Sequence, residues 1–134
     1  MNGSLTIIFK ESDLAMVKMP LGSEVCLRDN SFFCLVNTDD ETTVICPAAN
    51  VPNGALEVSE GWVGFKVQGP MDFGMVGVMA NLSKALADSG ISLIAISTFD
   101  TDWILVRKDK TKDAAIAWQN AGHKVLDIPN DLQP

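Results

Sequence analysis

The chain has 134 residues, of which 47% are hydrophobic and 20% are charged, so it can bury a substantial hydrophobic core. Its net charge of −7 and its lack of a Lys/Arg cluster argue against nucleic-acid binding, which needs several cations on one face. No stretch approaches the roughly 20 apolar residues of a membrane span, and the N-terminal segment "MNGSLTIIFKES" lacks the pattern of a signal peptide. We therefore expect a mature cytoplasmic chain without membrane or nucleic-acid partners.

The first half of the chain has a less regular pattern than the second. Strands are predicted over residues 5–12 and 13–20, a hairpin over residues 31–37 and 42–48, and a connector over residues 50–61. The connector is predicted because proline, asparagine and glycine interrupt that segment. No helix with a clear apolar stripe is predicted here.

The second half predicts a complete set of elements. A strand over 62–68 precedes a helix that ends at Gly90. Strands over 91–99 and 102–108 then surround a short turn. A second helix begins with Thr111 as its cap and ends at Gly122, and a last strand covers 123–128. This order, βαββαβ, is the ferredoxin-like arrangement. The predicted class is therefore α+β, with two helices covering one face of a four-stranded antiparallel sheet.

The two central strands of this half are apolar on both faces. In residues 91–99, Leu93 and Phe99 lie on one side while Ile94 and Ile96 lie on the other. In residues 102–108, Trp103 and Leu105 alternate with Ile104 and Val106 in the same way. A sheet with one wet face would be polar on that face, so we expect another domain, another chain or both to cover it.

A shift of sixty residues relates the two halves weakly. It places Thr38 on Thr98 and Asp40 on Asp100, so that "NTDDETTVIC" matches "STFDTDWILV". The same shift places Leu5 and Ile7 on Phe65 and Val67. The first half is interpreted as a degenerate copy of the second, although chance similarity between apolar strands is an alternative.

The segment "GPMDFGMVGVMANLSKALADSGISLIAISTFDTDWILV" resembles the ACT domain, a small-molecule-binding regulatory module. The specific parts are the "DFGMVGV" loop, the "ALADSGISLIAIST" join and the "TFDTDWILV" hairpin. The likeness is to the tandem branch, which includes the CASTOR arginine sensors and is related to the regulatory domains of aspartate kinases. It implies two tandem ACT-like units, a degenerate one over residues 1–60 and an ACT domain over 61–134.

The resemblance also implies a function. It implies a homodimer that binds a free amino acid at an inter-domain or inter-subunit interface. A partner enzyme is a further candidate partner. The implied ligand-binding residues are Asp72, Phe73, Gly74, Met75, Val76, Gly77, Val78, Ser97, Thr98, Phe99 and Asp100. A helix N-terminus suits the ligand carboxylate, and nearby acids and carbonyls suit its ammonium group.

Two of the acids have alternative interpretations. Asp72 could cap the helix rather than contact a ligand, and Asp100 could be a turn residue. The overall negative charge favours a basic amino acid slightly. The acids of the two turns do not form an EF-hand pattern, so no metal site is predicted.

Catalysis is not predicted, because no nucleophile–base pair can be identified. His123 is the single histidine and is expected to have a structural role at an element boundary. Cys26, Cys34 and Cys46 are expected to be buried reduced thiols. We therefore expect a non-catalytic regulatory protein without cofactors, the alternative being a constitutive dimerisation or protein-interaction module without a ligand.

Overall fold

The computed structural model describes residues 4–27, 29–68 and 77–134. In these residues the strands are β1 (Thr6–Met19), β2 (Cys34–Asn37), β3 (Thr42–Pro47), β4 (Glu57–Gln68), β5 (Ile94–Ser97), β6 (Asp102–Arg107) and β7 (Lys124–Leu126). The helices are α1 (Val78–Asp88) and α2 (Thr111–Asn120), and three short 3-10 helices cover Ala48–Asn50 (η1), Lys108–Lys110 (η2) and Asn130–Leu132 (η3). The strands hydrogen bond in the order β2-β3-β1-β4-β6-β5, and β7 pairs with β1.

The chain divides into two compact units. One is formed by Met1–Ser12 together with Val63–Pro134, and we call it the discontinuous unit. The other is Asp13–Trp62, which we call the inserted unit. The sequence predicted two tandem copies, over residues 1–60 and 61–134. That these segments are copies of one another stays a prediction. In the structure, however, the first twelve residues cluster with the C-terminal half.

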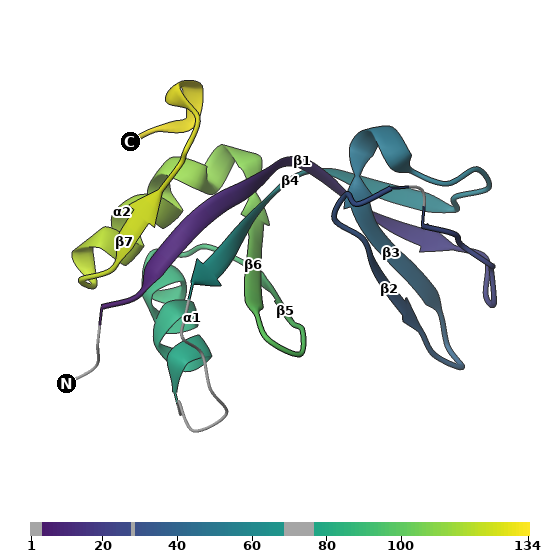
Figure 1. Ribbon diagram of the computed structural model, residues 1–134, viewed down its shortest axis with the longest axis horizontal. Helices are drawn as coiled ribbons and strands as arrows, with labels where there is room; N and C mark the ends of the chain where they lie inside the picture. Colours follow the sequence, from purple (N-terminus) through teal and green to yellow (C-terminus); the bar gives the residue numbers. More distant parts are fainter. Residues whose placement is uncertain (1–3, 28, 69–76) are drawn as a thin grey trace. The chain divides into compact units, whose positions relative to one another are not determined.

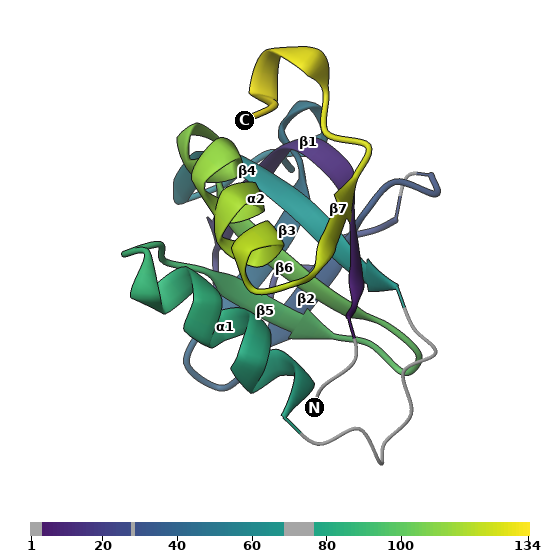
Figure 2. The same cartoon turned by 90° about the vertical axis from the view of Figure 1, so that its left-hand side faces the viewer.

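The discontinuous unit contains the predicted order of strands and helices. Helices α1 and α2 cover one face of its sheet (Figures 1 and 2). The predicted four-stranded antiparallel sheet is wrong in one respect, because β1 lies between β4 and β7. Thr6–Ile8 of β1 pair with Lys124–Leu126 of β7, and this pairing is parallel. The additional strand comes from the other end of the chain, which the local pattern of residues 62–128 cannot reveal.

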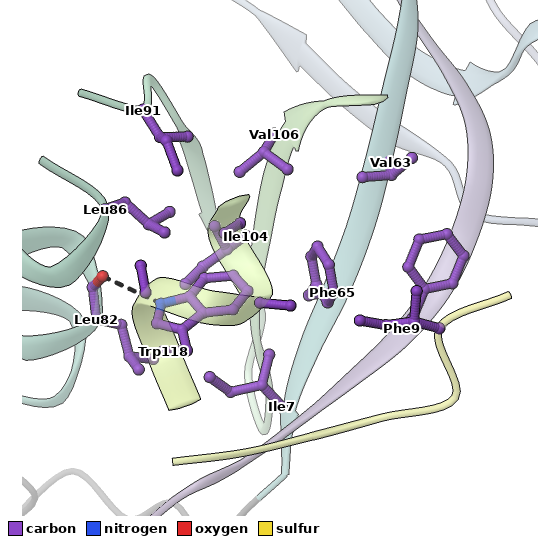
Figure 3. Close-up of a cluster of buried hydrophobic side chains, with 14 of the residues drawn as sticks. Ile7, Phe9, Val63, Phe65, Leu82, Leu86, Ile91, Ile104, Val106 and Trp118 are labelled. Carbon is purple, nitrogen blue, oxygen red and sulfur yellow. Dashed lines mark hydrogen bonds between the residues drawn. The ribbon is translucent and has the colours of Figure 1, made fainter. Parts of the chain in front are cut away.

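The core of this unit lies between the sheet and the helices (Figure 3). Phe65 of β4 packs edge-on against Phe9 at 5.4 Å and against Trp118 at 5.0 Å between ring centroids. The indole Nε1 of Trp118 donates a hydrogen bond of 3.2 Å to the carbonyl of Leu82, which joins α2 to α1. The fully buried Trp118 thus has both its ring and its polar atom satisfied, as a buried indole requires.

Both helices end as the sequence predicts. Gly90 has a φ of 73° and Gly122 a φ of 94°, which is the left-handed conformation that glycine adopts without strain. At the first end, the backbone N–H of Ile91 donates to the carbonyl of Leu86 at 2.9 Å. The start of the second helix differs from prediction, because Thr111 is its first residue rather than its cap. Its hydroxyl donates to the carbonyl of Lys108, in the 3-10 turn η2 that precedes α2.

The inserted unit has its own small hydrophobic cluster. Ala15, Val17 and Met19 of β1 pack with Val44 and Cys46 of β3. Loops that include Val25, Phe33, Val51 and Ala55 cover this cluster. No α-helix occurs in the described residues of this unit.

The hairpins of the two units match residue for residue at a shift of sixty. Cys34 pairs with Ile45 and Asn37 with Thr42, just as Ile94 pairs with Leu105 and Ser97 with Asp102. A 3-10 helix follows each hairpin, over Ala48–Asn50 and Lys108–Lys110. The predicted hairpin of residues 31–48 is confirmed, and its geometry copies that of the second hairpin.

Three other details of the first half differ from prediction. Thr6–Met19 form one continuous strand in place of the two strands predicted over 5–12 and 13–20, and β4 begins at Glu57, inside the predicted connector. The proposed match of Leu5 and Ile7 to Phe65 and Val67 fails, since Ile7 packs in the same cluster as Phe65. The strand segment that pairs with β3 is instead Leu14–Met19.

Candidate functional site

The predicted site residues fall in two segments of the discontinuous unit. Asp72, Phe73, Gly74, Met75 and Val76 lie outside the described residues. Gly77 and Val78 stand at the start of α1, and Ser97, Thr98, Phe99 and Asp100 stand at the end of β5 and in the turn to β6. Figures 1 and 2 show the start of α1 and the β5–β6 turn at the same end of this unit.

The start of α1 is formed by backbone groups. Gly77 is the N-cap residue with a φ of 85°, and its carbonyl accepts the hydrogen bond of the Asn81 N–H at 2.8 Å. No side chain caps this end among the described residues, and the first turn of the helix contains no acid. A side chain at Gly77 would strain the backbone, although the space around its Cβ position is open. The positive end of the helix dipole therefore lies at an exposed residue.

The β5–β6 turn is held together by its own hydroxyl groups. The backbone N–H of Thr98 donates to the carbonyl of Thr101 at 2.8 Å, and the Thr98 hydroxyl oxygen accepts the Thr101 N–H at 3.0 Å. The hydroxyl of Ser97 donates to the carboxylate of Asp102 at 2.6 Å. Asp102 thus fixes the two strand ends on either side of the turn.

Phe99 and Asp100 form the tip of the turn. The Phe99 side chain is 83% exposed, which differs from the prediction that it extends the apolar face of the strand. The strand ends at Ser97, because the turn bonds of Thr98 begin at the next residue. Asp100 is also exposed. An exposed acid and an exposed aromatic ring on one rigid turn can contact a cationic group of a ligand.

His123 has a structural position close to this unit's first strand. Its Nδ1 accepts the backbone N–H of Leu5 at 3.1 Å, so its Nε2 carries the proton and donates to Asn81 Oδ1 at 2.9 Å. Burial lowers the pKa of His123, which favours the neutral ring that these two bonds require. The predicted structural role at an element boundary is confirmed by these contacts.

The cysteines have different environments from one another. Cys46 is buried and Cys34 is half-buried, whereas Cys26 is exposed, so the prediction of three buried thiols is wrong for Cys26. Cys26 lies in the loop after β1 rather than in a strand. Burial raises the pKa of the Cys34 thiol, which disfavours the reactive thiolate.

The described residues contain neither a cluster that could hold a metal ion nor a membrane-spanning helix. Residues 4–27, 29–68 and 77–134 contain no group of three or more His, Cys, Asp or Glu side chains that could hold a metal ion. Within the same residues, neither the length nor the apolar character of any helix is sufficient for a membrane span.

Comparison with known proteins supports this fold. Residues 57–119 match the family model of the ACT domain. The matched segment covers slightly under half of the chain and runs from β4 through most of α2. No curated protein matches the chain in sequence.

Three solved structures are similar to the chain. A crystal structure of an Agobacterium tumefaciens protein is 27% identical, with a TM-score of 0.84, over 93% of this chain and 94% of that one. Clostridium acetobutylicum aspartate kinase is 12% identical, with a TM-score of 0.67, over 90% of this chain and 35% of the kinase. The regulatory subunit of aspartate kinase from Thermus thermophilus is 8% identical, with a TM-score of 0.60, over 91% of this chain and 97% of the subunit. The similarity to the two aspartate kinase structures is a similarity of fold alone.

The sequence did not reveal every feature of potential function. A cavity in the inserted unit is lined by residues 24–27, 29, 31–33, 50, 52 and 53. The sequence analysis assigned no role to the first segment and interpreted the second as part of a connector. One sequence signal could have drawn attention to these two segments. They lack a helical pattern, whereas the second half of the chain has two helices.

Proposed function

We propose that this chain is a non-catalytic regulatory protein of the ACT-domain type that binds a free amino acid. The observation that carries the proposal is the exposed Gly77 at the start of α1, where no side chain of the described residues caps the helix, at the same end of the discontinuous unit as the β5–β6 turn. Backbone N–H groups at Gly77 and Val78 would hold the ligand carboxylate. The turn at Ser97, Thr98, Phe99 and Asp100 would hold its ammonium group and its side chain.

The comparisons support a regulatory role in coarser terms. The matched family is the ACT domain, and the similar structures include a kinase described as allosteric and a regulatory subunit described as ligand-free. Asp72 to Val76 complete the proposed site as the resemblance implies. Binding at an interface between domains or subunits, and a homodimer that regulates a partner enzyme, belong to the same proposal.

We also propose that the two units are tandem copies, the first degenerate. The support is the register of the two hairpins, in which each pair of one hairpin corresponds to a pair of the other at a shift of sixty. The turn bonds follow the same shift, since Thr38 N–H donates to the carbonyl of Glu41 at 2.9 Å and Thr98 N–H to that of Thr101 at 2.8 Å. Two hairpins with the same strand register are stronger support for tandem copies than two hairpins that are merely both apolar.

Thermal unfolding with each of the twenty amino acids tests the function. A ligand at about 100 times its dissociation constant raises the free energy of unfolding by roughly 2.7 kcal/mol, which gives a clear rise in the melting temperature. We expect a rise with at least one amino acid, and a smaller one with its decarboxylated amine. The absence of any rise at millimolar concentrations would contradict the proposal.

A constitutive dimerisation module is the second candidate. It is favoured by the edge strand β2, which pairs only with β3 among the described strands and exposes Leu35 and Val36 at 44% and 50%. Exposed apolar residues on an edge strand are typical of a pairing surface. Sedimentation that gives the same dimer with and without amino acids, together with no thermal shift, would favour this candidate over the first.

A further inference from the structure

Strand β2 of the inserted unit lies at an edge of the sheet (Figure 1). Among the described strands it pairs only with β3, from Cys34 opposite Ile45 to Asn37 opposite Thr42. Its other side therefore presents backbone N–H and C=O groups that no described strand pairs. Proteins usually protect such an edge with a lysine, a proline or a bulge. The sequence of β2 contains neither residue, and its register with β3 is regular, so the edge can accept a further strand.

The side chains of β2 differ from those of its counterpart in the second hairpin. At a shift of sixty, β2 corresponds to β5, which is also an edge strand. Leu35 stands where β5 has Ala95, and the Leu35 side chain is exposed. Val36 is exposed as well, whereas the corresponding Ile96 is half-buried. The edge of the inserted unit thus exposes two large apolar side chains, while the exposed side chains of β5 are small.

The two exposed side chains lie on opposite faces of the strand. Leu35 pairs with Val44, a fully buried member of the hydrophobic cluster of this unit, so Leu35 lies on the face of that cluster. Val36 pairs with Thr43 on the other face. Because the side chains of a strand alternate between faces, an added strand would cover Leu35 with one residue and Val36 with the next. This arrangement fits a short extended segment that is apolar on both faces.

The inserted unit carries nearly all of the net charge of the chain. Asp13–Trp62 contains eight Asp or Glu residues and two Lys or Arg residues, a net charge of −6, whereas the remainder has nine acids and eight bases, a net charge of −1. Three of the acids lie exposed in the turn that directly follows β2, namely Asp39, Asp40 and Glu41. The corresponding turn of the other unit has one acid, Asp100. Positive charge on a segment that pairs with β2 would therefore be attracted.

We propose that β2 is a docking edge for a basic extended segment of a partner protein, which adds to the sheet as a further strand. The backbone ladder would supply affinity, Leu35 and Val36 would supply apolar contact, and the acidic turn would favour lysine or arginine beside the paired residues. A second copy of the chain fits less well, because two inserted units of net charge −6 repel each other. The proposal concerns the inserted unit and does not depend on amino-acid binding at α1 and the β5–β6 turn.

Three peptides test the proposal with the full isotope-labelled chain. The peptide KKVIVKK combines an apolar strand with basic flanks, and EEVIVEE reverses the charge of the flanks. The peptide KKVPVKK keeps the positive charge, but its proline cannot donate to the backbone ladder. We expect saturable NMR shifts at the amides of residues 34–37 with KKVIVKK, and weaker binding as sodium chloride is raised. EEVIVEE and KKVPVKK should leave these amides unchanged at the same concentration.

Three variants separate apolar contact from charge. Leu35→Ala gives β2 the residue type that β5 has at the corresponding position, and it should weaken KKVIVKK binding about fivefold to tenfold. Asp40→Asn should weaken the same binding about threefold, as expected for an exposed ion pair. Leu56→Ala is the matched control and should leave the affinity unchanged, because Leu56 is an exposed leucine of the same unit that lies outside β2.

A charge on the edge separates a partner peptide from a second copy of the chain. Val36→Lys protects the edge as natural edge strands are protected, and it should abolish KKVIVKK binding without changing the sedimentation of the chain alone. Equal binding of KKVIVKK and EEVIVEE, unchanged affinity in Leu35→Ala or no saturable shift at millimolar KKVIVKK would overturn the proposal. A dimer that dissociates in Val36→Lys would also overturn it, because a second copy would then occupy β2. None of these outcomes would change the result of the amino-acid titration at α1 and the β5–β6 turn.

Discussion

At the scale of single residues, His123 links three elements through one neutral ring. Its two nitrogens bond Leu5, directly before β1, and Asn81 in α1, and His123 itself stands directly before β7. Because these bonds need one protonated and one unprotonated nitrogen, a charged ring would lose the bond from the Leu5 N–H. The residue can therefore stabilise the fold only in its neutral form.

This arrangement predicts a pH dependence of stability. The folded-state pKa of His123 is lowered from its usual 6.5, so the unfolded chain takes up the proton more readily. Its contribution to the free energy of unfolding is complete above pH of about 6.5 and is lost as the pH falls below that value toward the lowered pKa. Thermal melts between pH 7 and pH 5 should show a larger loss of stability in the natural chain than in His123→Gln. An equal loss in both would show that other groups cause it.

Asp100 is the acid of the β5–β6 turn that is available for a ligand. Asp102 accepts the hydroxyl of Ser97, whereas Asp100 lies exposed at the tip. Asp100→Asn should weaken binding of the amino acid that gives the largest thermal shift about threefold to fivefold. The melting temperature without ligand should stay the same. Calorimetric titration measures the first effect, and Asp113→Asn, an exposed acid on α2, is the control. Unchanged affinity in Asp100→Asn would assign Asp100 to the turn alone.

At the scale of elements, the two hairpin turns share one design. In each, a threonine hydroxyl oxygen accepts a backbone N–H three residues later, at 3.1 Å for Thr38 and Glu41 and at 3.0 Å for Thr98 and Thr101. The same hydroxyls donate to the carbonyls of Glu41 and Thr101. Both turns are therefore stabilised by local side-chain bonds that replace part of the backbone ladder.

Removing this hydroxyl should have the same effect in both turns. Thr38→Val and Thr98→Val keep the shape of the side chain but remove its bonds, and each should lower the free energy of unfolding by about 1 kcal/mol. Thr43→Val removes a single exposed bond to Glu41 and should cost less. Chemical denaturation of the three variants measures these differences. A large effect in one turn and none in the other would contradict the tandem interpretation.

The sequence predicts those elements whose residues are buried in a regular pattern. The strands around the second turn, the ends of both helices at Gly90 and Gly122, and the first hairpin follow from local alternation and glycine positions. The errors have a common physical cause. Residues 10–13 of β1 are polar because this segment connects two separate clusters, and a polar segment inside a strand resembles a turn. Residues 57–60 of β4 are all exposed, so they lack the apolar signal of a strand.

At the scale of the whole molecule, the two compact units do not correspond to the two halves of the sequence. The inserted unit lies within the discontinuous unit in the sequence, between Ser12 and Val63. The parallel pairing of β1 with β7 joins residues that are more than one hundred positions apart, and no local pattern encodes it. The division of the chain, the parallel edge strand and the cavity of the inserted unit were therefore inaccessible to sequence reasoning. The resemblance to the ACT domain was accessible, because its loop, join and hairpin occupy one continuous segment.

The proposed regulatory function depends on one claim, which is that an amino acid binds at the start of α1 and the β5–β6 turn. The most direct measurement is an NMR titration of the labelled chain with each of the twenty amino acids. The account predicts that at least one of them causes saturable shifts in the amides of Gly77, Val78 and residues 97–100, whereas the amides of the inserted-unit cavity are unaffected. If every amino acid leaves Gly77, Val78 and residues 97–100 unchanged, the account is contradicted.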